Sequence, residues 1–162
     1  MADGRWLIQD VKLTNCTFEV LSVFNKATNI ECLIFSSVWL HDWSVTMFKG
    51  NSLKVLRIDT CNATDEFLQQ LTTQHELEEV ELLHCHGLTG TGLTSFITSC
   101  TTSITTFSLS CKIEWDIKCL DRLVNLQHLL LDGITFPDTS FVHICKDLKK
   151  LEQLILSRLN IS

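Results

Sequence analysis

The stretch LEEVELLHCHGLTGTGLTSFITSC, residues 77–100, contains a short pattern that organises the whole chain. It opens with apolar residues at Leu77, Val80 and Leu82, and the last two alternate with polar or variable residues. Alternation with a period of two is typical of a short β-strand that buries one face. The stretch therefore predicts a strand near its start, with its other face left to solvent.

The same apolar triplet occurs seven times along the chain, and successive triplets start 22, 23, 24, 27, 22 and 25 residues apart. The seven triplets are Ile8/Val11/Leu13, Ile30/Leu33/Phe35, Leu53/Leu56/Ile58, Leu77/Val80/Leu82, Ile104/Phe107/Leu109, Leu126/Leu129/Leu131 and Leu151/Leu154/Leu156. A period of about 20 to 29 residues is typical of leucine-rich repeats. The pattern predicts a solenoid, in which each unit packs only on its neighbours and a long surface is offered to a partner.

Between the predicted strands, apolar residues follow helical intervals of three or four. The groups are Phe18/Leu21/Phe24, Phe67/Leu68/Leu71, Ile117/Leu120/Leu123 and Phe141/Ile144/Cys145/Leu148. Thr64 or Asp65 is expected to cap one of these helices, and Asp138 or Thr139 another. Residues 38–52 lack a clean helical face and are expected to form a short irregular or 3-10 turn.

Together these patterns predict an α/β fold: one leucine-rich-repeat domain over residues 1–162, with about seven repeats. The repeats start near residues 8, 30, 53, 77, 104, 126 and 151. A parallel sheet is expected on the concave face, with short helices or 3-10 turns on the convex face. No clear capping repeat is visible at either end.

Composition restricts the classes of partner and the compartment. The net charge of −6 disfavours nucleic acid and anionic membrane surfaces, because both require a basic patch. No apolar run approaches the roughly 20 residues that a membrane helix needs. The first residues, MADGRWLIQD, lack the apolar core of a signal peptide, so we expect the eight cysteines to be reduced in the cytoplasm or the nucleus.

A turn position follows each triplet by three residues, and it is cysteine in three of the first four units. Its occupants are Cys16, Val38, Cys61, Cys85, Lys112, Ile134 and Leu159. Cysteine behaves there as a small apolar side chain whose thiol can donate a weak hydrogen bond to the backbone. We therefore expect Cys16, Cys61 and Cys85 to be buried packing residues.

Two motifs around residues 84–94 could instead form a metal site or a phosphate-binding loop. His84, His86 and Cys111 could form a metal site and support a metal-dependent enzyme, but both histidines are expected to point away from Cys85. Residues 87–94, GLTGTGLT, have the glycine spacing of a phosphate-binding loop, yet Leu93 stands where the lysine belongs. We expect no cofactor, no metal and no catalytic residues.

Residues 77–100 also carry a resemblance to a known family. Their leucines, Cys85, the pair Leu88 and Thr89, Gly92 with Leu93, and Phe96 resemble the cysteine-containing class of leucine-rich repeats. That class occurs in the repeat arms of F-box ubiquitin-ligase receptors, within the ribonuclease-inhibitor-like superfamily, which also includes the sensing arms of nucleotide-binding immune receptors. The resemblance implies a solenoid that binds proteins.

Candidate partner-binding residues occupy the variable places that flank the buried strand residues. One group is charged and lies in the third and fourth units: Arg57, Asp59, Glu79 and Glu81, with Leu83 beside them. This group suits a partner with a basic segment, although Arg57 and Glu81 could instead simply pair with each other. The second group is Leu130 and Ile155, with His128 nearby. It predicts an apolar binding patch, although these could also be isolated apolar residues on the surface.

The last predicted strand leads to a second interaction hypothesis. Five apolar residues near the end are expected to face solvent beside an unpaired strand edge: Leu151, Leu154, Leu156, Leu159 and Ile161. Such an edge favours self-association, unless the chain is part of a longer protein. The main functional expectation is a non-enzymatic interaction module, an adaptor or ubiquitin-ligase substrate receptor, and the alternative is the sensing arm of an immune receptor.

Overall fold

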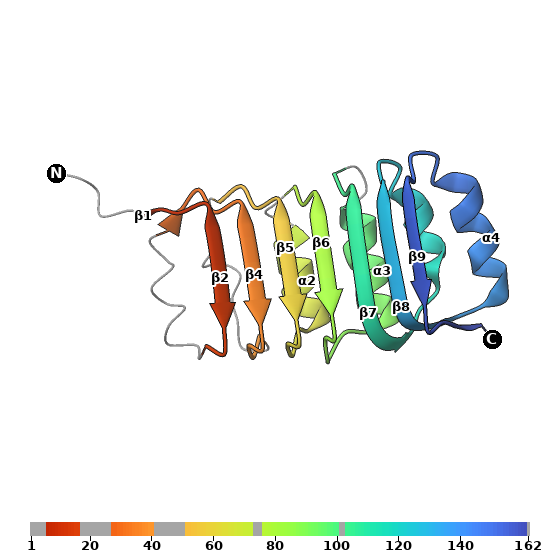
Figure 1. The fold of residues 1–162 in the computed structure, drawn as a ribbon, viewed down its shortest axis with the longest axis horizontal. Helices are drawn as coiled ribbons and strands as arrows, with labels where there is room; N and C mark the ends of the chain where they lie inside the picture. The colour runs from red at the N-terminus through yellow and green to blue at the C-terminus, as the bar shows by residue number, and fades with distance from the viewer. Residues whose placement is uncertain (1–5, 17–26, 41–50, 73–75, 101–102, 162) are drawn as a thin grey trace.

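A computed structural model describes residues 6–16, 27–40, 51–72, 76–100 and 103–161 of the chain. It is a mixed α/β structure built on one open parallel sheet (Figure 1). The strands of this sheet are β2 (Asp10–Thr14), β4 (Cys32–Ser36), β5 (Val55–Asp59), β6 (Glu79–Leu83), β7 (Thr106–Glu114), β8 (His128–Phe136), β9 (Gln153–Ser157) and β10 (Asn160–Ile161). The short strands β1 (Trp6–Leu7) and β3 (Ala27–Thr28) pair separately.

The strands lie in sequence order, so each one pairs with the strand of the neighbouring unit. From β2 to β8 the order is unbroken, and both β9 and β10 pair with β8. The apolar triplets are in step: Leu56 of β5 faces Val80 of β6, which faces Phe107 of β7. All seven predicted strand positions therefore join one parallel sheet, as the period-two pattern predicts.

The described helices cover one face of this sheet, as Figure 1 shows. They are α2 (Asp65–Thr72), α3 (Gly90–Ser99), the 3-10 helix η3 (Ile117–Arg122) and α4 (Asp138–Asp147). The apolar residues that predicted the segments after β5 and β7 are buried: Phe67, Leu68, Leu71, Ile117, Leu120 and Leu123. Ile144 and Leu148 are buried as well, whereas Phe18, Leu21, Phe24 and the side chains of Phe141 and Cys145 lie outside the described residues.

One of the two predicted helix caps is confirmed and the other is wrong. The Phe67 amide donates to the hydroxyl of Thr64 at 3.2 Å, so Thr64 caps α2. Helix α4 begins at Asp138, so its cap position falls on Pro137, which makes no side-chain capping bond. The fixed φ of proline already sets the entry to a helix, so neither Asp138 nor Thr139 takes the cap position. Of the turn expected over residues 38–52, residues 41–50 lie outside the described part.

In six of the seven units, a left-handed residue just after the five paired positions of the strand turns the following side chain inward. These residues have positive φ and are Asn15, Ser37, Thr60, His84, Gly133 and Arg158. The inward residues include Cys61, with 1% of its surface exposed, and Cys85, with 7%. The expectation that Cys16 is equally buried is wrong: its thiol is partly exposed and donates to the Thr14 carbonyl oxygen at 3.2 Å.

The fifth unit departs from this turn because β7 carries one extra residue. Ser110 pairs with Asp132, but the next pair joins Ile113 to Ile134, so the ladder contains a β-bulge. Ile113 therefore takes the turn position, and the assignment of that position to Lys112 is wrong. Lys112 is exposed, whereas Cys111 is turned inward with 8% of its surface exposed.

The final strand is only partly as exposed as its sequence predicts. Leu154 and Ile161 expose 38% and 60% of their surfaces. Leu151, Leu156 and Leu159 are instead half-buried against the core, because β9 and β10 both pair with β8. Self-association through this edge stays a prediction.

Candidate functional site

The face of the sheet opposite the described helices carries every predicted partner-binding residue, and we call it the open face. Its central row is Lys12, Ile34, Arg57, Glu81, Ser108, Leu130 and Ile155, which successive strands place side by side. The flanking rows include Glu79 and His128 on one side, and Asp59 and Leu83 on the other. In β5 and β6, open-face residues are half-buried while their neighbours in sequence are fully buried.

Arg57 is the centre of an acidic cluster on the open face, formed with Glu79, Glu81 and Asp59. The Arg57 guanidinium donates through Nε to Glu79 Oε1 at 3.1 Å, and its terminal nitrogen also contacts that oxygen. Nε lies 3.5 Å from Glu81 Oε2. The hydrogen bond to Glu79 raises the pKa of Arg57. The pairing that the sequence left open is therefore present, but Glu79 and Glu81 share one guanidinium and Asp59 lies beside them, so the cluster keeps a negative charge.

His84 extends this cluster along β6. Its Nδ1 lies 3.1 Å from Asp59 Oδ1, and the side chains of His84 and Asp59 expose 62% and 47% of their surfaces. The sequence predicts an outward-pointing His84, as a solvated residue or a metal ligand, but not its contact with Asp59. The left-handed conformation after β6 causes it, because it directs the His84 side chain outward beside the end of β5.

The apolar patch lies two strands away from the acidic cluster. Leu130 of β8 pairs with Ile155 of β9, and Ile155 exposes 42% of its surface. His128 lies in the same strand as Leu130, and its Nδ1 is 3.4 Å from the Thr106 hydroxyl. Strand β7 separates the two groups and presents only hydroxyl side chains between them, those of Thr106, Ser108 and Ser110.

A hollow of about 1000 Å³ lies at the carboxyl ends of β6, β7 and β8, next to the open face. We call it the carboxyl-end hollow. Asp132 lies on its wall, 8% exposed, and accepts from Ser110 Oγ at 2.7 Å and from Arg158 Nε at 2.7 Å. These bonds, above all the one from Arg158, hold the pKa of the Asp132 carboxyl well below its usual range. Sequence analysis did not single out this network, although Asp132 and Arg158 both follow predicted strand positions.

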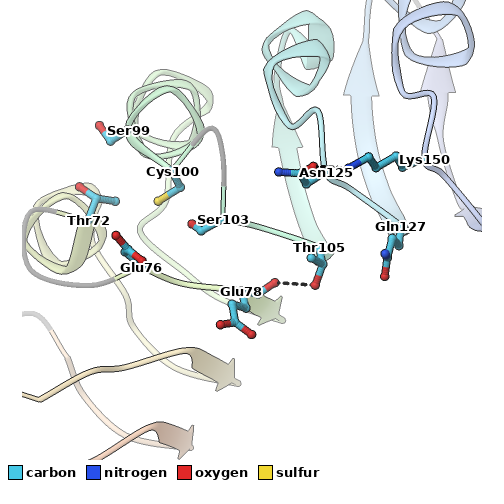
Figure 2. Close-up of a pocket in the computed structure, with 10 residues that line it drawn as sticks. All are labelled: Thr72, Glu76, Glu78, Ser99, Cys100, Ser103, Thr105, Asn125, Gln127 and Lys150. Carbon is cyan, nitrogen blue, oxygen red and sulfur yellow. Dashed lines mark hydrogen bonds between the residues drawn. The ribbon is translucent and has the colours of Figure 1, made fainter.

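A second hollow, of about 670 Å³, lies at the amino ends of the strands (Figure 2). Several of its polar side chains already form hydrogen bonds within the chain. Lys150 donates to Asn125 Oδ1 at 2.7 Å, and the Thr105 hydroxyl donates to the Glu78 carbonyl oxygen at 3.2 Å. Figure 2 shows Glu76, Thr72 and Ser99 on one side of this hollow and Lys150 on the other. We assign no function to it.

The glycines of residues 87–94 serve the packing of neighbouring units. Asp65 accepts from the Thr89 amide at 2.9 Å and from the Thr89 hydroxyl at 2.6 Å, and Thr89 in turn caps α3 through the Gly92 amide at 3.0 Å. A β-carbon on Gly92 would overlap the Asp65 carboxylate, and one on Gly90 would overlap the Glu114 carbonyl oxygen. Close approach between units therefore accounts for both glycines.

The three residues of the metal hypothesis do not form a recognisable ligand set. Within the described part of the chain, no three His, Cys, Asp or Glu side chains converge as a metal site would require. His84 is directed to Asp59, while Cys111 is buried beside Cys85.

Comparison with known proteins adds no family: no family model and no curated protein matches the chain. Among the described residues, no helix is both long and apolar enough to cross a membrane. The chain is thus a mixed α/β protein with an open parallel sheet. The features that bear on its function are the residues of the open face.

Proposed function

We propose that the chain is a non-enzymatic protein-interaction module, a leucine-rich-repeat solenoid of about seven repeats whose open face binds a partner with a basic segment. The repeat assignment is supported by the seven apolar triplets and by their common register in one sheet. Repeats of this kind offer an extended sheet surface to other proteins.

The observation that carries the proposal is the excess of carboxylates around Arg57. Glu79, Glu81 and Asp59 lie together on one face, and their charge is only partly balanced by Arg57. A lysine or arginine of a partner would supply the missing cation and speed association. The half-buried Leu130 and the exposed Ile155 would add apolar contacts, which charge alone does not provide.

The distance between the two groups suggests the length of the partner segment. From β5 to β9 there are four strand spacings of about 4.8 Å, roughly 19 Å in total. An extended chain covers that distance with about six residues. A segment with basic residues at one end and apolar residues at the other would match the open face.

An adaptor or a ubiquitin-ligase substrate receptor would use such a face, and so would the sensing arm of an immune receptor. Both roles share the binding of a protein segment to the open face. That shared step is the one to test first.

The test is a display selection from a random library of twelve-residue peptides, followed by affinity measurements on the selected peptides. We expect enrichment of lysine and arginine, and a loss of affinity of about tenfold in the double variant Glu79→Gln, Glu81→Gln. The matched control is Glu66→Gln with Asp121→Asn, which removes the same charge from exposed positions of α2 and η3. Equal losses in the two variants, or no enrichment of basic residues, would refute the proposal.

A further inference from the structure

Cys111 is the one buried thiol at a strand end that the repeat pattern does not explain. In the other units the residue at the corresponding place is left-handed, and in five of the six it is an exposed polar residue, as with Thr60 and His84. In the fifth unit the bulge in β7 turns this residue inward, and Ile113 takes over the packing role at the turn. The fold itself therefore requires no sulfur at position 111.

The inward turn brings Cys111 against Cys85 of the neighbouring unit. Strands β6 and β7 are in register up to Leu83 and Ser110, and the two cysteines follow these residues closely. The Cys85 thiol donates to the Leu83 carbonyl oxygen at 3.5 Å and the Cys111 thiol to the Leu82 carbonyl oxygen at 3.7 Å, so both sulfurs lie beside consecutive peptide groups of β6. The register places Cys111 opposite His84, the residue before Cys85, and strands about 4.8 Å apart bring such diagonal neighbours within the range of about 4.4 to 6.8 Å between the Cα atoms of a disulfide.

The environment distinguishes the two sulfurs. The interaction with Cys85, and after it the proximity of His84, lowers the pKa of Cys111, whereas the interaction with Cys111 and burial raise the pKa of Cys85. Both cysteines are among the residues that line the carboxyl-end hollow, which gives a small molecule a route toward them. Elsewhere burial raises the pKa of Cys100 to about 12 and that of Cys119 to about 11, so those thiols stay protonated.

We propose that Cys85 and Cys111 form a redox-active dithiol that a hydroperoxide converts to a cross-strand disulfide. The Cys111 thiolate attacks one peroxide oxygen and the O–O bond breaks, which leaves a sulfenic acid on Cys111 and releases water from hydrogen peroxide after protonation. The Cys85 sulfur then attacks the Cys111 sulfur, the S–O bond breaks and a second water leaves. Sulfur is oxidised and the peroxide oxygen is reduced. A dithiol reductant reverses the bond. This inference does not depend on the proposed function.

The test treats the folded, fully reduced 162-residue protein with a limiting amount of hydrogen peroxide and then alkylates the remaining thiols in denaturant. Digestion has to use chymotrypsin, because no lysine or arginine lies between Cys85 and Cys111, whereas Phe96 and Phe107 do. Mass spectrometry should find the two cysteines in linked peptides that lose the link in dithiothreitol. Cys16 and Cys32, which are more exposed, should still be alkylated.

Serine substitutions test which cysteine reacts with the peroxide and which one then forms the disulfide. In Cys85→Ser we expect a sulfenic acid on Cys111 that dimedone traps, and in Cys111→Ser we expect Cys85 to remain a thiol. Cys61→Ser is the matched control, because the Cys61 sulfur accepts from the Val38 amide and its thiol donates to the Asp59 carbonyl oxygen. That variant should still form the bridge.

The wild-type experiment tests the disulfide between Cys85 and Cys111 even if a variant fails to fold. Oxidation of Cys16 or Cys32 while Cys85 and Cys111 stay alkylated would overturn the proposal. So would a bridge between Cys85 and Cys61, or oxidation of Cys111 without a link to Cys85.

Discussion

At the scale of single residues, the end of each strand has the strongest influence on local chemistry. Residues such as His84 and Arg158 adopt a left-handed conformation there and direct their side chains back over the sheet edge. His84 thereby reaches Asp59, and Arg158 reaches Asp132. The polar contacts of the surface thus follow from a backbone feature that repeats with the units.

The Asp132 network gives a prediction for acid stability. Its bonds to Arg158 and Ser110 depress the pKa of Asp132 in the folded state. The stabilisation is therefore fully present above the unfolded-state pKa of about 3.9 and is lost as the pH falls below it. In Asp132→Asn, the free energy of unfolding should fall less steeply between about pH 4 and pH 2 than in the wild type, as measured by urea unfolding at several pH values.

Asp121→Asn serves as the control for this prediction, because Asp121 is an exposed carboxylate on η3. It should keep the acid dependence of the wild type. An unchanged acid dependence in Asp132→Asn would show that the Arg158 contact contributes nothing to folding.

The residue scale is also where sequence alone predicts least. The Arg57–Glu81 pair could be anticipated, because both positions follow from the strand register. The dominant partner of Arg57 is nevertheless Glu79, and which carboxylate a long side chain reaches depends on its rotamer. The contacts of His84 and Arg158 depend on left-handed backbone at residues that are not glycine, which a hydrophobic pattern does not report.

At the scale of elements, alternation between the two faces of a strand determines both stability and binding. In β8, Leu129 is buried with 1% of its surface exposed, whereas Leu130 lies half-buried on the open face. These two leucines are adjacent in sequence, identical in chemistry and opposite in direction. They form a matched pair for testing the fold.

We predict that Leu129→Ala lowers the free energy of unfolding by about 2 to 5 kcal/mol. Leu130→Ala should lower it by about 1 kcal/mol or less, because its side chain already contacts solvent. Chemical denaturation of both variants measures the difference. Equal losses, or a larger loss at position 130, would mean that the register of β8 is wrong.

Strand positions could be predicted well because seven apolar triplets repeat with nearly constant spacing. Helix ends were harder: Thr64 caps α2 as expected, but proline replaces a side-chain cap at α4. The bulge in β7 could not be predicted, since one inserted residue leaves the apolar triplet intact and only shifts the residues behind it. That shift also turns Cys111 inward beside Cys85, which the sequence did not predict.

At the scale of the whole molecule, the chain resembles a row of units in which each strand contacts the next (Figure 1). Helices occupy one side, and the open face presents acidic, hydroxyl and apolar groups in sequence order. The sequence predicted this arrangement of groups, because register follows from the triplets.

Photo-crosslinking tests the central proposal, that the open face is the binding surface, most directly. A selected peptide would carry a diazirine at its basic end in one sample and at its apolar end in another, and mass spectrometry would identify the crosslinked residues. We predict crosslinks from the basic end to residues 55–59 and 79–83, and from the apolar end to residues 128–132 and 153–157. Crosslinks concentrated on α2, α3, η3 or α4 would contradict the proposal.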